Sequence, residues 1–211
     1  MSAAAKRFHA TATTGRTASL ASVALIIVLH VEPASAHVGT GLPGGIAQGF
    51  AHPFGGLDHL LAMVSVGLWG AFLGRPLIHA LPVVFPVVMV FGAALGMFGV
   101  RIPPVELGIA LSVLALGSAI AIAWNARVPV ALVVVATFAL FHGYAHGREL
   151  PSAADPVGYS AGFVFATGLL HVIGIGIGVI ADRPRGRLVV RALGISIACV
   201  GVVLLWTAAS A

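Results

Sequence analysis

Long apolar stretches follow one another along most of this chain, and they constrain its fold more than any other feature. Short loops rich in Gly, Pro and Arg separate six such stretches, at 50–73, 77–99, 104–124, 128–147, 157–180 and 188–209. About 20 apolar residues are enough for a helix to cross a bilayer. Only 8% of the residues are charged, against about a quarter in an ordinary globular chain. We therefore predict an all-α membrane protein with six transmembrane helices.

The first 36 residues have the organisation of a secretory signal peptide. Basic residues precede the apolar core LASVALIIVLHV, and the small-residue sequence ASA closes the segment. We predict cleavage after this signal peptide (1–36), which leaves a mature transmembrane domain at 37–211 that begins with His37. The alternative is a retained first span, which the short core and the following Glu32 and Pro33 disfavour.

The arginines predict the orientation of the spans. With the mature N-terminus outside, the inner side holds six arginines, namely Arg75, Arg127, Arg183, Arg185, Arg187 and Arg191. The outer loops hold only Arg101 and Arg148. Short cytoplasmic loops carry an excess of Lys and Arg, so this distribution supports an N-terminus outside the cell membrane.

Composition also excludes several classes of function. The net charge is +5, but no basic patch with interleaved aromatic residues appears, so we predict no nucleic-acid partner. The single cysteine, Cys199, excludes an internal disulfide and a thiolate metal cluster. No P-loop sequence is present, which argues against nucleotide hydrolysis. Membrane lipid is the expected surrounding partner, and the oligomeric state stays open, a homo-oligomer included.

The sequence HPFGGLDH at 52–59 places ionisable residues at the mouth of the first predicted span. His52 and His59 are seven residues apart, which on a continuous helix would separate them by about 10 Å. A proline and two glycines lie between them. We therefore predict an interrupted helix that lets His52 fold towards Asp58 and His59.

The sequence FHGYAHGRE forms a second cluster at the end of the fourth predicted span. His142, His146 and Glu149 follow i, i+4, i+7 spacing and project from one helix face. Two imidazoles one turn apart can chelate one divalent ion, and a carboxylate one turn further can complete the site or anchor a histidine. The first span runs inwards and the fourth outwards, so both clusters are predicted in the outer half of the membrane.

Two further histidines are candidate ligands. His171 stands alone in the fifth predicted span, and His37 can chelate an ion with the new N-terminal amine. An ionisable group inside a span costs about 2.5–3.5 kcal/mol on insertion scales, whereas a polar contact between helices returns only about 0.6 kcal/mol. A purely structural role is therefore a stronger alternative for the lone His171 than for the two clusters. The predicted metal residues are His37, His52, Asp58, His59, His142, His146, Glu149 and His171.

The donor chemistry narrows the metal and leaves other functions open. Imidazole and carboxylate without thiolate suit Ni(II), Co(II) or Zn(II) and argue against Cu(I). One alternative is an intramembrane zinc hydrolase, in which Asp58 or Glu149 acts on a metal-bound water. Another is haem ligation by histidines on facing helices, which the adjacent carboxylates disfavour.

Both clusters match signatures of a known family. HPFGGLDHLLAMVSVGLWGA resembles the first-helix signature of the HupE/UreJ family of nickel and cobalt permeases, and FHGYAHGREL resembles its fourth-helix signature. The resemblance covers essentially the whole mature chain. It implies a non-enzymatic secondary permease of the bacterial inner membrane, with a periplasmic N-terminus, that supplies metalloenzymes such as hydrogenase or urease.

The resemblance also implies roles for particular residues. The transported ion would be Ni(II) or Co(II), with no prosthetic group. First-helix metal roles carry over to His52, Asp58 and His59, and fourth-helix roles to His142 and Glu149. His146 stands in the fourth-helix motif as well, whereas His37 and His171 lie outside both signatures.

Overall fold

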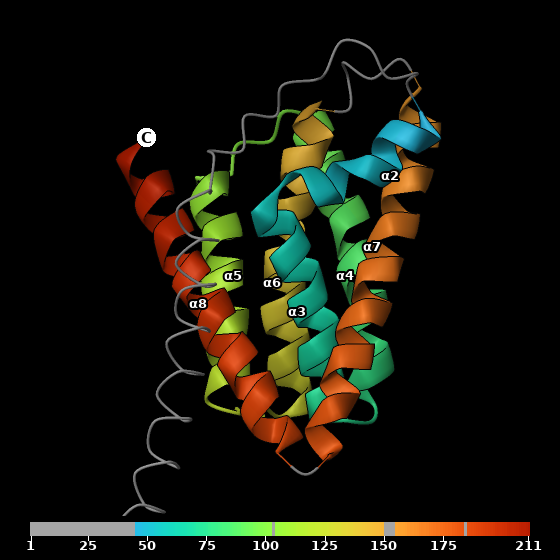
Figure 1. Cartoon of the computed structure of the whole chain (residues 1–211). Helices are drawn as coiled ribbons and strands as arrows, with labels where there is room; N and C mark the ends of the chain where they lie inside the picture. Colours follow the sequence, from blue (N-terminus) through green and yellow to red (C-terminus); the bar gives the residue numbers. More distant parts are fainter. Residues whose placement is uncertain (1–44, 103, 150–154, 184) are drawn as a thin grey trace, which may run out of the picture. The chain divides into compact units, whose positions relative to one another are not determined.

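A computed structural model describes residues 45–211 apart from 103, 150–154 and 184. This part of the chain is helical and contains no strand (Figure 1). Its helices are α2 (Ile46–Gly55), α3 (Leu57–Leu73), α4 (Leu77–Met97), α5 (Val105–Ala121), α6 (Val128–Glu149), α7 (Pro156–Val179) and α8 (Gly186–Ser210), with a 3-10 turn, η2 (Ile180–Asp182), before α8. The predicted signal peptide and His37 lie outside the described residues.

Helix length and hydropathy confirm the prediction of an all-α membrane protein. Four helices are long and apolar enough to cross a bilayer, namely α4, α6, α7 together with η2, and α8. The bent pair of α2 and α3 is also long and apolar enough when the two are taken as one span. Helix α5 is apolar but has only 17 residues. Such a helix is about 26 Å long, against a hydrocarbon core of about 30 Å. The sixth span therefore stays a prediction.

The first predicted span is broken into two helices. The axes of α2 and α3 differ by 88°, and Gly56 between them has an extended backbone, with φ −117° and ψ 126°. In Figure 1, α2 turns away from the upper end of α3 and runs to α7. The predicted interruption between His52 and His59 is thus confirmed, and it is sharper than a loosened first turn.

Helix α3 occupies the centre of the bundle. It contacts α4, α5 and α7, while α4 packs on α6 and α5 on α8. Eight of its residues are buried, including Met63 and Trp69. The indole Nε1 of Trp69 donates to the backbone oxygen of Trp124 over 3.2 Å. This position lets α3 present its side chains to several neighbouring helices at once.

Glycine brings α3 and α7 into close contact. A Cβ added at Gly67 would collide with the backbone oxygen of His171, and one added at Gly174 would collide with that of Val64. Small residues permit this approach between membrane helices. This contact fixes the position of His171 along the axis of α3.

Candidate metal centre

Three histidines from three different helices converge near the bend of the first span. They are His52 of α2, His59 of α3 and His146 of α6, and one ligand atom of each lies within 4.8 Å of the other two. The ring centroids are 4.8 Å apart for His52 and His146 and 4.8 Å apart for His59 and His146. Nitrogens that share a tetrahedral ion at about 2.1 Å are about 3.4 Å apart. Small side-chain movements would therefore close this group around an ion.

The bend at Gly56 positions His52 for this contact. The ring centroids of His52 and His59 are 5.9 Å apart, well below the separation of about 10 Å on a straight helix. Without the break, His52 would continue along the axis of α3 and away from His59. The two signature histidines therefore meet because the helix between them is interrupted.

Two aromatic side chains of α7 pack beside the three histidines. The ring of Phe163 lies 4.3 Å from that of His146, and the ring of Tyr159 lies 5.7 Å from that of His52. Both aromatic residues are buried. Neither residue was predicted from the sequence, although their i, i+4 spacing places both on one face of a helix.

Asp58 contacts the three-histidine group through His59. Its Oδ1 lies 2.9 Å from His59 Nδ1 and accepts a hydrogen bond of 2.8 Å from the backbone nitrogen of His59. When a carboxylate accepts from Nδ1–H, the lone pair of the ring is on Nε2. In this arrangement Asp58 orients His59, as carboxylates behind metal-binding histidines commonly do.

His142 lies beside the group, one helical turn before His146. It is completely buried, and its ring centroid is 4.9 Å from that of His59. Its Nε2 lies 3.0 Å from the hydroxyl oxygen of Ser112 on α5. The structure thus brings His52, His59, His142 and His146 together at one end of the bundle.

The remaining predicted ligands have different positions. His171 is buried in α7, and its ring is 5.4 Å from that of Phe85, whose ring is also 5.7 Å from that of His142. His171 is therefore separate from the three-histidine group. Glu149 ends α6, one turn after His146, but its side chain is outside the described part of the structure, as is the whole of His37.

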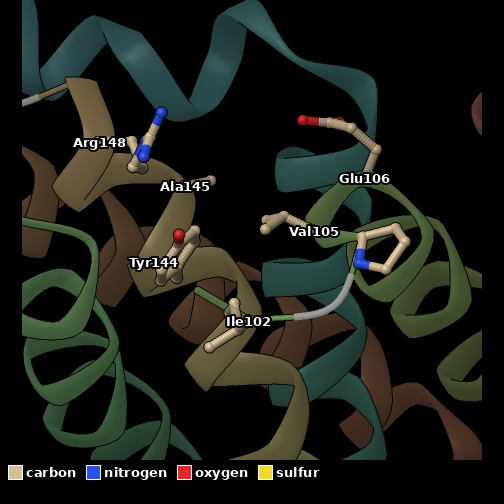
Figure 2. Close-up of a pocket in the computed structure, with 7 residues that line it drawn as sticks. Ile102, Val105, Glu106, Tyr144, Ala145 and Arg148 are labelled. Carbon is tan, nitrogen blue, oxygen red and sulfur yellow. The ribbon is translucent and has the colours of Figure 1, made fainter. Parts of the chain in front are cut away.

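A cavity of about 420 Å³ opens between the start of α5 and the end of α6 (Figure 2). Its lining includes Tyr144 and Ala145, which directly precede His146, together with the charged residues Glu106 and Arg148. The cavity therefore reaches the same end of the bundle as the histidines. Glu106 was not predicted as a site residue, because a single carboxylate at the start of an apolar segment forms no motif in the sequence.

Comparison with known proteins gives two matches. The chain matches the family described as "HupE / UreJ protein" over residues 7–204. It is 44% identical to "Protein HupE" of Rhizobium leguminosarum bv. viciae over 189 residues, which are 90% of this chain and 96% of that relative. No solved structure matched the chain. The family match includes every helix that contributes to the histidine cluster.

Proposed function

Because the chain belongs to the HupE/UreJ family, we propose that it is a secondary transporter of nickel or cobalt ions in the bacterial inner membrane, supplying metalloenzymes such as hydrogenase or urease. The family resemblance supports the nature of the cargo. The observation that extends the proposal to particular residues is the convergence of His52, His59 and His146. Imidazole nitrogens are suitable donors for both ions.

The proposed path uses all the predicted ligands. An ion is captured near His37 and His52 and is then held by His59, His142 and His146 with the help of Asp58 and Glu149. Release passes His171 and the glycine-rich α7. A divalent ion that enters down the membrane potential gains about 4–5 kcal/mol per 100 mV, so the route needs no nucleotide.

The proposed membrane arrangement has six spans. The bent pair of α2 and α3 forms the first, and α5 forms a short third span. The signal peptide is cleaved, and the mature N-terminus is periplasmic. In this orientation the histidine cluster lies in the outer half of the membrane, where it receives ions from outside.

Uptake of radioactive nickel into cells tests the proposal. Expression of the full chain should raise nickel accumulation, and His59→Ala should abolish the increase. His79→Ala is the matched control, because His79 is exposed on α4 and belongs to no part of the cluster. Unchanged accumulation on expression of the wild type would overturn the proposal.

Competition between ions tests the cargo. Nickel uptake should fall in the presence of cobalt and be little affected by Cu(I), because the donors are nitrogen and oxygen. The same competition in Asp58→Ala links the selectivity to the site. Neither comparison supports the zinc hydrolase alternative; one tightly bound zinc per purified chain, with hydrolysis of lipid esters or amides, would be needed to favour it.

A further inference from the structure

Ser112 joins α5 to His142 through two short polar contacts. Its Oγ donates to the backbone oxygen of Ile109 over 2.6 Å and lies 3.0 Å from His142 Nε2. Both Ser112 and His142 are completely buried. Water therefore does not compete for either contact.

The single hydroxyl hydrogen determines the direction of both hydrogen bonds. Two oxygens 2.6 Å apart share a hydrogen, and the carbonyl of Ile109 has none to give. Ser112 must supply its hydrogen to that carbonyl, so it can only accept from His142. Nε2 of His142 therefore carries a proton, and in the neutral ring the lone pair is on Nδ1.

We propose that Ser112 is a positioning residue of the metal site, which fixes His142 as the Nε2–H tautomer and so provides Nδ1 as a further nitrogen donor beside His59. This inference rests on the proposed function. Nδ1 of His142 is buried and has no hydrogen-bond partner among the described residues. A buried acceptor without a partner is unfavourable, and binding a cation removes that disadvantage.

Two histidines of the site are thus oriented by different partners. Asp58 bonds Nδ1 of His59, whereas Ser112 bonds Nε2 of His142. Opposite nitrogens of the two rings therefore carry the lone pairs. The partner of a metal-binding histidine sets its tautomer and its basicity, so each partner acts on affinity without touching the ion.

Nickel binding to the purified full-length protein and nickel uptake into cells test this role together. Loss of such a partner lowers metal affinity by about 10–100-fold. Ser112→Ala should therefore raise the dissociation constant and the apparent KM for nickel about tenfold or more, with the maximal rate nearly unchanged. Ser112→Thr, which keeps the hydroxyl, should restore both values. Wild-type affinity in Ser112→Ala would overturn the proposal.

Ser65→Ala is the matched control. Ser65 is also completely buried, and its hydroxyl has no hydrogen-bond partner among the described residues. Its replacement removes the same group without breaking a hydrogen bond to a histidine, so nickel affinity should stay at the wild-type value. Equal losses in Ser65→Ala and Ser112→Ala would assign the effect to packing and overturn the positioning role.

Nitrogen-15 NMR of histidine-labelled wild-type protein reads the tautomer directly and needs no variant of Ser112. The His142 signal, assigned by its absence in His142→Gln, should show a protonated Nε2 and an unprotonated Nδ1. The opposite tautomer would overturn the inference. Failure of the wild type to accumulate nickel would instead overturn the transport function, because the tautomer and nickel binding are measured on the purified protein.

Discussion

The imidazole of His59 is hydrogen bonded to the side chain of Asp58, its immediate neighbour in sequence, with 2.9 Å between Nδ1 and Oδ1. Successive residues of a helix point about 100° apart, so this pairing depends on its place in the first turn of α3. There the carboxylate also accepts from the backbone nitrogen of His59. One side chain thus accepts a hydrogen bond from a backbone N–H of the first turn and orients a histidine of the proposed site.

Replacing the carboxylate should weaken nickel binding. Asp58→Asn keeps the size of the side chain but removes the charge that makes His59 more basic. We expect the apparent KM for nickel uptake to rise about 10–100-fold, as on loss of other such partners. Asp182→Asn, which removes an exposed carboxylate, is the control. An unchanged KM in Asp58→Asn would contradict the orienting role.

His171 should affect release more than binding, because its ring contacts Phe85 and it is separate from the three-histidine group. We expect His171→Ala to reduce the maximal rate of nickel uptake, while the nickel affinity of the purified protein stays within about twofold of wild type. A variant that impairs a step after binding shows this pattern. His79→Ala again serves as the control. Loss of nickel binding in His171→Ala would place His171 at the first binding step instead.

The close contact of α3 with α7 should be sensitive to one methyl group. Gly67→Ala introduces a Cβ against the backbone of His171, and overpacking of this kind costs about 1–3 kcal/mol. A Cβ added at Gly168 on α7 would meet no other atom within 4 Å, so Gly168→Ala should be no less stable than wild type. Thermal unfolding in detergent measures both. Equal unfolding midpoints for Gly67→Ala and Gly168→Ala would show that the helices separate easily at Gly67.

Nickel uptake should weaken in acid. A protonated imidazole has no lone pair for the ion, and an ordinary histidine gains its proton near pH 6.5. Protons therefore compete with nickel, and the apparent KM should rise as the pH falls from 7.5 to 5. The measurement is initial uptake at fixed membrane potential. A flat profile across this range would contradict competition between protons and nickel at the site.

Local signals in the sequence were sufficient for much of the fold. Apolar length predicted the helices, and the residues Pro and Gly between His52 and His59 predicted the break. The end of α5 was different. The predicted segment extends to Trp124, but the helix stops at Ala121, and Ala123 adopts a left-handed backbone with φ 54°. Alanine has no intrinsic preference for that conformation, so the turn reflects tertiary packing.

The site was only partly predictable for a related reason. Helical spacing placed His142 and His146 on one face, and topology placed them opposite His52 and His59. The partner of His142 could not be found this way, because Ser112 is 30 residues away and on a different helix. A serine in an apolar helix is unremarkable in sequence. Its role depends on which nitrogen of which histidine lies against it.

Because of the bend at Gly56, the two ends of HPFGGLDH belong to different helices with different neighbours. His52 belongs to α2, which packs on α7, while His59 belongs to α3 at the centre of the bundle. A change in the angle at this corner alters the distance between the two rings and leaves both helices intact. An ion bound to both rings would link α2 to α3 and restrict the angle between them. By linkage, occupancy of the site and the angle of the corner must then influence each other equally.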